Sequence, residues 1–592
     1  MQKTTFALLP VSTLIFCAML AGCGGGGGSS SGNSSGNNGS GSGSAGNLNP
    51  PAPTQQTIRV NVSGYDGTAP LVLTNNGTDP LSVSANGVYS FSAPLADNST
   101  YAVTVATEPP GQNCTVSNGT GTVAGTLSDL VISCVNLAVA PPYPSGPYVS
   151  ASIDVLRSTP GQTLNASFIG LSYEKGEMSK PVLSGTDAAL VKLLNLLGPG
   201  VLRIGGNSVN TTTWNANGPG STTNVIAPAD VDRVASLLAA TGWKVIYGLN
   251  HVTNTNANIA SEAQYAAQKF GTALLGFEIG NEPDLYHDLN SGIYNSTYTF
   301  ASFAAQWQSY ESAILAVVPN AVFTGPASSY NVAGYTVPFA QQEGTQIKLL
   351  TQHYYRANGQ SPTSTLALLL AGDPNLPTEL QTLNSAARAA ALPYGYRLAE
   401  ANSFYNGGAP AISDAYGTAL WILDFLFINA QNGSSGVNMH GGGTGPYTPI
   451  TDNGTIATGP RPEYYGLYLF SLAADGQLLS TQTDQSGAAA INFTSYAVGK
   501  TDGSTEVLLN NKDATNSVYA TINLNATGAV TATLTTLTGT DLSATTGYTL
   551  NGALIGNDGS WTGGTATTVY VTPQGTLTII VPPMSAILVH AG

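Results

Sequence analysis

The stretch GFEIGNEPDLY, Gly276 to Tyr286, places an apolar run directly before Asn281, Glu282 and Pro283. A buried strand favours residues such as Phe and Ile, whereas Asn, Pro and Glu are depleted in strands. The strand should therefore end at this point, with the proline preventing any regular continuation. Breaks in local preference of this kind are expected mainly at functional or strained sites.

Similar short apolar runs recur along the chain, separated by segments of helical periodicity such as TDAALVKLLNLLG and PADVDRVASLLAATG. In chain order the runs are FIGLSY, VLRIGG, KVIYGLN, LLGFEIGNE, AVFTGPAS, IKLLTQHYY, YRLAEAN and GVNMHGG. Eight strand–helix units within residues 168–475 predict a (β/α)8 TIM barrel. In that fold the chemistry lies at the carboxyl ends of the strands.

Alternation with period two predicts a β-sandwich on each side of the barrel. Residues 56–138 contain runs such as TIRVNVSGY and DLVISCV, and residues 476–592 contain TEVLLNNK and SAILVHA. Residues 139–150 form a proline-rich linker between the first sandwich and the rest of the chain. The strand-like segment 151–167 is expected to join the C-terminal sandwich.

The first sandwich is small and is expected to be closed by a disulfide between Cys114 and Cys134, the cysteines left once the leader region is set aside. Its role has two interpretations. Tyr65, Tyr89 and Tyr101 could stack on sugar rings, as in a carbohydrate-binding module. The favoured interpretation is a spacer with ordinary core and surface tyrosines.

The first 23 residues, MQKTTFALLPVSTLIFCAMLAGC, have the form of a bacterial lipoprotein signal peptide in which Cys23 becomes the lipidated residue. The alternative is an ordinary secretory signal that happens to contain a cysteine. Residues 24–55 are rich in Gly and Ser and should form a flexible tether. We therefore expect an exported protein of the bacterial cell envelope, anchored by lipid to the outer membrane or cell surface.

The charge balance excludes one class of partner. The chain has 32 acidic residues, 17 basic residues and a net charge of −15, and charged residues make up only 8% of it. It lacks the Lys/Arg clusters that bind nucleic acids or sulfated polymers. We expect neither as a partner, and we expect a monomer.

Glu282 ends the fourth run and Glu400 ends the seventh. In a barrel, these two carboxylates would face one cleft from roughly opposite walls. Paired carboxylates suit glycoside hydrolysis, in which one acts as general acid and the other as nucleophile or base. The structural alternative is that Glu282 caps a helix and Glu400 is a charge on the barrel rim.

Several motifs in the same order resemble glycoside hydrolase family 79, the β-glucuronidase and heparanase family of the retaining (β/α)8 clan. The motifs are LRIGGN, GNEPDLY, QHYY, AEANSFYNGGAPAISDAYGTALWILDFL and HGGGTGPYTP. The resemblance covers the chain from about residue 150 to the end. It implies that Glu282 is the acid/base and Glu400 the nucleophile, which is expected to stay ionised while Glu282 stays protonated.

The resemblance also implies a set of supporting residues. Arg203 and Tyr355 would support the nucleophile, and Asn281 would bind the sugar 2-hydroxyl. Tyr405, Gly407 and Tyr447 would bind the substrate carboxylate. Tyr173 and Glu174 end the first run and are expected to line the same pocket. His353 is either a supporting residue behind the site or a packed core histidine.

The resulting hypothesis is a retaining exo-β-glucuronidase that releases terminal glucuronic acid, with or without a 4-O-methyl group, from glycans. It needs no metal and no organic cofactor. Two alternatives remain among enzymes, namely another exo-glycosidase of the same clan and a heparanase-like endo-β-glucuronidase. An alternative of a different class is a non-catalytic glycan-binding surface lipoprotein.

Overall fold

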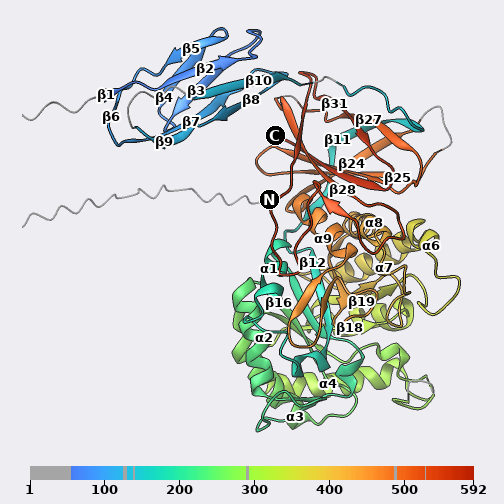
Figure 1. Cartoon of the computed structure of the whole chain (residues 1–592). Helices are drawn as coiled ribbons and strands as arrows, with labels where there is room; N and C mark the ends of the chain where they lie inside the picture. Colours follow the sequence, from blue (N-terminus) through green and yellow to red (C-terminus); the bar gives the residue numbers. More distant parts are fainter. Residues whose placement is uncertain (1–54, 124–129, 138–139, 289–291, 486–489, 527) are drawn as a thin grey trace, which may run out of the picture. The chain divides into compact units, whose positions relative to one another are not determined.

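The computed structural model describes residues 55–592 except for 124–129, 138–139, 289–291, 486–489 and 527 (Figure 1). The expected signal peptide, Cys23 and the tether up to residue 54 lie outside the described residues. In the part of the chain that the structure describes, no helix is long and apolar enough to span a membrane.

Eight parallel strands close into a barrel, which confirms the fold class expected from the sequence. In order around the barrel they are β12 (Ile169–Glu174), β13 (Val201–Gly205), β16 (Lys244–Leu249), β17 (Leu274–Ile279), β18 (Phe323–Ser328), β19 (Ile347–Tyr355), β20 (Tyr396–Asn402) and β21 (Ser434–Gly441). Nearly every residue of these strands is buried, as expected for parallel strands covered by helices.

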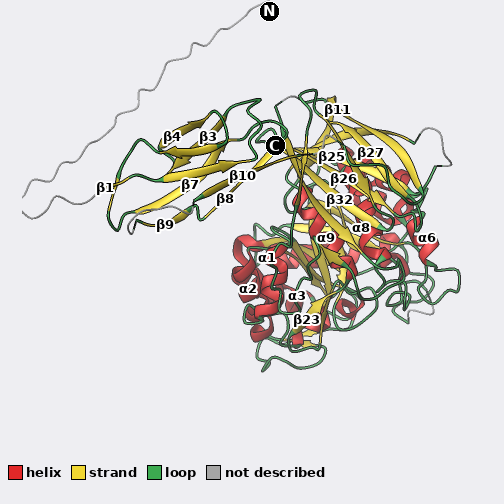
Figure 2. Cartoon of the chain, turned by 45° about the horizontal axis from the view of Figure 1, so that its top comes forward, coloured by secondary structure: helices red, strands yellow, loops and turns green. Residues whose placement is uncertain are grey.

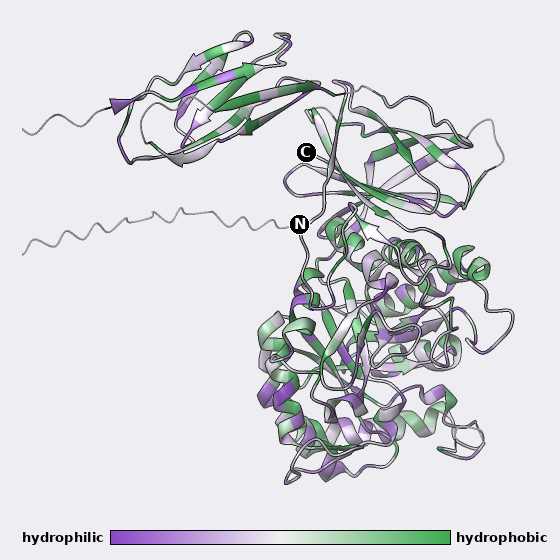
Figure 3. Ribbon diagram, viewed as in Figure 1, coloured by the Kyte–Doolittle hydropathy of each residue, from purple (hydrophilic) through white to green (hydrophobic). Residues whose placement is uncertain are grey.

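Helices surround the barrel strands (Figure 2). They are α1 (Ala188–Leu196), α2 (Pro228–Thr241), α3 (Asn256–Phe270), α4 (Phe300–Leu315), α5 (Val337–Glu343), α6 (Leu366–Leu370), α7 (Leu376–Ala389), α8 (Gly417–Gln431) and α9 (Pro462–Ala473). Unlike the amphipathic α2 and α3, helices α8 and α9 are buried along almost their whole length, and Figure 3 colours them largely as hydrophobic. Such helices must be covered on more than one side.

The cover for α8 and α9 comes from a ten-stranded sheet near the C-terminus. Along its main path the order is β29 (Thr549–Leu550), β28 (Thr531–Thr538), β32 (Ser585–Ala591), β26 (Thr505–Asn511), β25 (Phe493–Gly499), β24 (Gly476–Asp484), β11 (Tyr148–Leu164), β27 (Ser517–Asn523) and β31 (Thr576–Val581), and β30 (Thr567–Tyr570) pairs with β28. Residues from distant strands of this sheet share one apolar core. This region is therefore a β-sandwich whose strands all belong to one continuously hydrogen-bonded sheet.

Strand β11 precedes the barrel in sequence yet lies inside the C-terminal sheet. It pairs antiparallel with β24 and parallel with β27. Its alternating burial, with Val149, Ala151, Ile153 and Val155 buried, matches a strand that has one face on a core.

The N-terminal region forms its own small sandwich. One four-stranded sheet has the order β5 (Gly87–Ser90), β2 (Arg59–Ser63), β10 (Val131–Asn136), β8 (Gln112–Ser117), and the other has the order β4 (Asp79–Val83), β3 (Leu71–Asn75), β7 (Thr100–Thr107), β9 (Thr120–Thr122). The expected disulfide joins Cys114 on β8 to Cys134 on β10. Tyr65 is buried in the core between the sheets, so it is not available to stack on a sugar, and the rings of Tyr89 and Tyr101 pack against the same core.

Candidate active site

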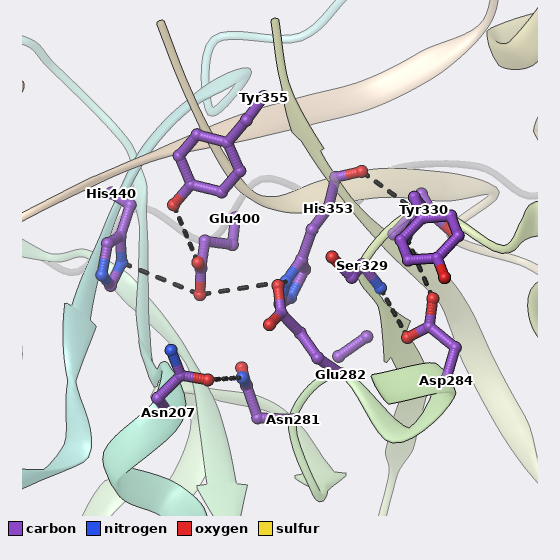
Figure 4. A network of polar contacts seen from close by, with 12 residues as sticks. Asn207, Asn281, Glu282, Asp284, Ser329, Tyr330, His353, Tyr355, Glu400 and His440 are labelled. Carbon is purple, nitrogen blue, oxygen red and sulfur yellow. Dashed lines mark hydrogen bonds and ion pairs between the residues drawn. The ribbon is translucent and has the colours of Figure 1, made fainter. Parts of the chain in front are cut away.

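Glu282 occupies an unusual backbone position just beyond β17. Its φ and ψ are both 53°, in the left-handed region, and the short helix η4 (Pro283–Leu285) follows at once. A non-glycine residue seldom adopts this conformation, and such residues cluster at functional sites. The Glu282 N–H donates to the Ala327 carbonyl at 2.9 Å, which fixes the turn against β18. The carboxylate thereby points towards His353 on β19 (Figure 4).

Glu400 lies on β20 and is only 6% exposed. Arg203 Nη1 donates to its Oε2 at 2.7 Å, and the Tyr355 hydroxyl donates to its Oε1 at 2.8 Å. Burial opposes ionisation of Glu400. Nevertheless His440, His353, Arg203 and the hydrogen bond from Tyr355 outweigh burial and hold the pKa of this carboxyl far below its usual 4.5.

The two glutamates face each other across a short gap. One carboxylate oxygen of Glu282, one ring nitrogen of His353 and one carboxylate oxygen of Glu400 all lie within 4.8 Å of one another. His353 Nδ1 is 3.0 Å from Glu282 Oε1 and 4.0 Å from Glu400 Oε2. This spacing could also suit a cation, but the Arg203 guanidinium already supplies positive charge to Glu400. The arrangement therefore fits acid–base chemistry with two carboxylates.

Arg203 links four barrel strands beneath the two glutamates. It is fully buried, and its Nε donates to Glu278 Oε2 at 2.6 Å while Nη2 donates to Asn281 Oδ1 at 2.9 Å. Its Nη1 also lies 3.2 Å from Ser172 Oγ. Burial opposes its charge, but Glu278 and Glu400 raise the pKa of Arg203 above its ordinary value. Arg203 is therefore a fixed positive charge shared by two buried carboxylates.

Asn281 precedes the acid/base candidate and is 1% exposed. Besides its bond to Arg203, its Nδ2 donates to Asn207 Oδ1 at 3.2 Å, and its carbonyl accepts a hydrogen bond from Asn210 Nδ2. Tyr286 in turn donates to Asn210 Oδ1 at 2.8 Å. These contacts hold the Asn281 amide in one orientation at the carboxyl end of β17.

Three tyrosines gather beside Glu400. The Tyr355 ring lies 6.4 Å from that of Tyr405 and 6.3 Å from that of Tyr447. Tyr405 is 45% exposed, whereas burial, followed by the charge of Glu400, raises the pKa of Tyr447. Gly407 has φ of 84°, and a Cβ there would meet open space. The structure thus brings the three tyrosines expected from the sequence together, and Gly407 follows Tyr405 by two residues.

Successive side chains at the end of β12 face opposite sides, one the site and the next the hydrophobic core. Ser172 points inward to Arg203, so strand alternation turns Tyr173 outward. Tyr173 is 4% exposed and belongs to the main hydrophobic core, and the charged groups that raise its pKa after burial are Asp452, Glu177 and Asp187. The expectation that Tyr173 lines the pocket is therefore corrected. Tyr173 is a core residue.

Glu174 does lie near the site. Its carboxylate accepts hydrogen bonds from the backbone N–H groups of Asn207 and Ser208 at 3.1 and 2.7 Å. The backbone turns at Gly206, with φ of 71°, where a Cβ would come within 2.5 Å of the Glu174 carboxylate. His440 Nε2 is 3.8 Å from Glu174 Oε1. Glu174 therefore fixes the loop that presents Asn207 to Asn281.

His440 is a site residue to which the sequence argument gave no role. It lies on β21, with Nδ1 3.1 Å from Ser172 Oγ and 3.8 Å from Glu400 Oε2. Ser172, Glu278 and Asn207 were missed as well. The available signal was position, since His440 and Ser172 stand near the ends of predicted barrel strands, where functional side chains gather.

Two curated proteins are similar to this chain in sequence. A β-glucuronidase of Aspergillus niger is 28% identical over 249 residues, which cover 38% of this chain and 46% of that protein. A β-glucuronidase of Neurospora crassa is 26% identical over 394 residues, or 58% of this chain and 67% of that protein. The match thus spans about half of the Aspergillus protein. No protein-family model matches the chain.

Solved structures share the fold at low sequence identity. A 4-O-α-L-rhamnosyl-β-D-glucuronidase from Fusarium oxysporum superposes with a TM-score of 0.61 at 19% identity, covering 77% of this chain and 99% of that one. A family 51 arabinofuranosidase from Xanthomonas axonopodis gives 0.54 at 14% identity, covering 75% and 100%. The barrel, the facing glutamates and the two sequence relatives together support the class of glycoside hydrolases for this chain.

Proposed function

We propose that this chain is a retaining exo-β-glucuronidase that removes terminal glucuronic acid, with or without a 4-O-methyl group, from glycans. The observation that carries the proposal is the pair Glu282 and Glu400, with oxygen atoms within 4.8 Å, in a chain similar to two β-glucuronidases. Carboxyl groups about 5 Å apart are typical of retaining enzymes, whereas inverting enzymes need a wider gap for a water molecule.

In the first step, a Glu400 oxygen attacks the anomeric carbon while Glu282 gives its proton to the departing oxygen. The bond between the anomeric carbon and that oxygen breaks, and a glycosyl ester forms on Glu400. Arg203 and Tyr355 keep Glu400 ionised and oriented before attack. His353 lies at hydrogen-bond distance from Glu282 and can position its carboxyl group.

In the second step, Glu282 is a carboxylate and removes a proton from an incoming water molecule. The water oxygen attacks the anomeric carbon, and Glu400 leaves as a carboxylate. Two inversions at one carbon give net retention. In this proposal Asn281 binds the sugar 2-hydroxyl, a contact that strengthens in the transition state.

Recognition of the uronic acid carboxylate is assigned to Tyr405, Tyr447 and the backbone at Gly407. In the described part of the chain, Arg203 is the one arginine or lysine that bonds to either catalytic glutamate, and its donors already serve four partners. Neutral hydroxyl and amide donors near Glu400 can bind an anion without a second buried cation. Positive φ at Gly407 leaves its backbone open to close approach.

We further propose that the chain is exported, anchored through a lipid on Cys23 to the bacterial envelope, and acts as a monomer. The support for export and anchoring is the leader sequence and the Gly/Ser-rich segment behind it. Labelling with a fatty-acid analogue, with Cys23→Ala as the control, tests the anchor.

A substrate panel tests the proposed reaction. The purified protein should hydrolyse an aryl β-D-glucuronide and its 4-O-methyl analogue much faster than the matched β-glucoside and α-L-arabinofuranoside. Proton NMR should show the β-anomer of the free sugar as the first product. Glu400→Ala should lower kcat by at least about 10⁴-fold, because the attacking carboxylate is lost, while circular dichroism stays unchanged.

Three outcomes would contradict the proposal. Preferential cleavage of a neutral glycoside would reassign the substrate class. The α-anomer as first product would exclude retention, and near-normal turnover by the Glu400→Ala variant would exclude Glu400 as the nucleophile.

A further inference from the structure

The loop after β18 carries the most exposed large hydrophobic side chain among the described residues. Tyr330 is 68% exposed. The loop lies at the carboxyl end of a barrel strand, the end at which Glu282 and Glu400 also lie. An exposed aromatic ring at this end of the barrel is positioned for contact with a bound molecule rather than for packing in the core.

The backbone under Tyr330 is held firmly. Asp284 is 1% exposed, and its carboxylate accepts hydrogen bonds from the N–H groups of Ser329, Tyr330 and Asn331 at 2.8, 3.0 and 3.0 Å. The Asn331 side chain accepts a further bond from Gly334 N–H. Three amide donors compensate for burial of the Asp284 charge. The exposed ring therefore stands on an ordered loop, so little entropy is lost when a ligand contacts it.

The same loop is joined to the proposed acid/base. Asp284 lies two residues after Glu282, and the Glu282 N–H donates to the carbonyl of Ala327, just before the loop. Figure 4 shows Tyr330, Ser329 and Asp284 on the side of Glu282 and His353 that lies away from Glu400. The group that departs must bond to the oxygen that Glu282 protonates. It therefore leaves on the side of Glu282, whereas the glucuronic acid ring lies on the side of Glu400.

We propose that Tyr330 forms the binding site for the leaving group and stacks on a sugar ring attached through the bond that is cleaved. This inference rests on the proposed function. A pyranose presents a flat C–H face to an aromatic ring and hydroxyl groups at its edge, and tyrosine offers both an apolar face and a polar hydroxyl. Asp284 fixes the loop, and Tyr330 makes the contact.

The test compares substrates that differ only in the leaving group. Methyl β-D-glucuronide has no ring beyond the cleaved bond, whereas a glucuronosyl-glucose disaccharide has one. Tyr330→Ala should lower kcat/KM for the disaccharide about tenfold, the effect expected when one ring-stacking contact is lost, and should leave kcat/KM for the methyl glycoside unchanged. Tyr330→Phe should keep most of the activity on the disaccharide.

Tyr394→Ala is the matched control. Tyr394 is also exposed, at 45%, but it precedes β20 and so lies at the opposite end of the barrel. This variant should behave like the unmodified protein on both substrates. Equal losses for both substrates in Tyr330→Ala, or no loss for either, would overturn the inference. If the unmodified protein cleaves no glucuronide at all, the proposed function fails and this inference fails with it.

Discussion

Glu282 combines two features that a regular strand would not tolerate, namely a left-handed backbone and a proline directly behind it. Each is unfavourable alone. Together they turn the chain out of β17 so that the carboxylate faces His353 and, beyond it, Glu400. Opposite, Glu400 remains in a regular strand and depends on donors from neighbouring strands to stay ionised. The two glutamates are thus prepared for different roles by their surroundings.

Tyr355→Phe should shift the acidic limb of the pH–activity profile upward. The change removes the hydrogen bond to Glu400 Oε1, so the ionised form loses a stabilising donor and the pKa of Glu400 rises. Because the proposed mechanism requires ionised Glu400, the limb should move to higher pH by about one unit, the size expected for one hydrogen bond to a charged group. The measurement is kcat/KM for an aryl β-glucuronide from about pH 2 to 8, where the loss in the variant relative to the unmodified protein should grow towards the acidic end.

Tyr354→Phe is the control for this prediction. Tyr354 is the preceding residue on β19, but its hydroxyl donates to Asp373 Oδ2 at 3.1 Å, away from Glu400. Its profile should match that of the unmodified protein. An unchanged acidic limb in Tyr355→Phe would show that the hydroxyl does not stabilise ionised Glu400.

Individual site residues differed in how well the sequence could reveal them. Glu282 and Glu400 stood out because each ends an apolar run. Glu278 did not, because inside an apolar run it could not be distinguished from an isolated polar substitution until Arg203 was seen beside it. Tyr173 was misplaced because the run FIGLSY fixes a strand but not which of its faces points into the barrel, and an error of one residue reverses every side chain.

At the scale of elements, the ends of β20 and β21 are tied to the loop that carries Tyr447. Asn402 Nδ2 donates to the carbonyls of His440 and Tyr447 at 2.9 and 2.8 Å. Arg461, before α9, donates to three carbonyls of residues 444–446. The loop beside Glu400 is therefore fixed from both the barrel and α9. Neither tie was predictable from the sequence, since each joins residues whose contact depends on how the barrel closes.

Glu463, in the first turn of α9, lies behind Asn402 and is 1% exposed. Burial raises the pKa of Glu463 well above 4.5, so the folded chain keeps a proton that the unfolded chain releases. This contribution to stability is complete below pH 4.5 and is lost as pH rises towards the folded pKa. Glu463→Gln removes the titration. The variant should therefore gain stability relative to the unmodified protein by up to about 1.4 kcal/mol per pH unit above 4.5 until the folded pKa is reached.

Thermal unfolding at pH 5 and pH 8 measures this effect. The Tm of Glu463→Gln minus that of the unmodified protein should be larger at pH 8. A difference that does not change with pH would show that Glu463 is ionised in the folded protein.

At the scale of the whole molecule, the barrel and the C-terminal sheet share one hydrophobic core, which includes Tyr496, Leu508 and Leu588 of the sheet. Polar contacts join the same two regions. The Asn510 amide donates to the Leu420 carbonyl at 2.9 Å, and the Tyr416 hydroxyl donates to the Met584 carbonyl at 2.9 Å. The sequence identified both regions by their different periodicities, but it could not show that α8 serves as core for both.

Truncation should therefore be tolerated at the N-terminal end of the chain but not at the C-terminal end. Removal of residues 1–139 should leave kcat/KM for an aryl β-glucuronide unchanged, because the N-terminal sandwich has its own core and, among its described residues, contributes none to the site. Removal of residues 476–592 should abolish soluble expression, because α8 and α9 would expose apolar surface. Activity assays and soluble yield measure the two effects. A soluble, active barrel without its C-terminal sheet would contradict the shared core.

The position of β11 has a consequence for how the chain is made. Asp154 on β11 and Asn523 on β27 are bonded although 369 residues separate them. During synthesis β11 leaves the ribosome long before its neighbours β24 and β27 have been made. The backbone groups on both of its edges therefore stay unpaired while the entire barrel is translated. Open strand edges invite wrong pairing, and contacts between remote segments form slowly. We therefore expect assistance by chaperones to be needed until the last hundred or so residues emerge, since the sheet cannot close before then.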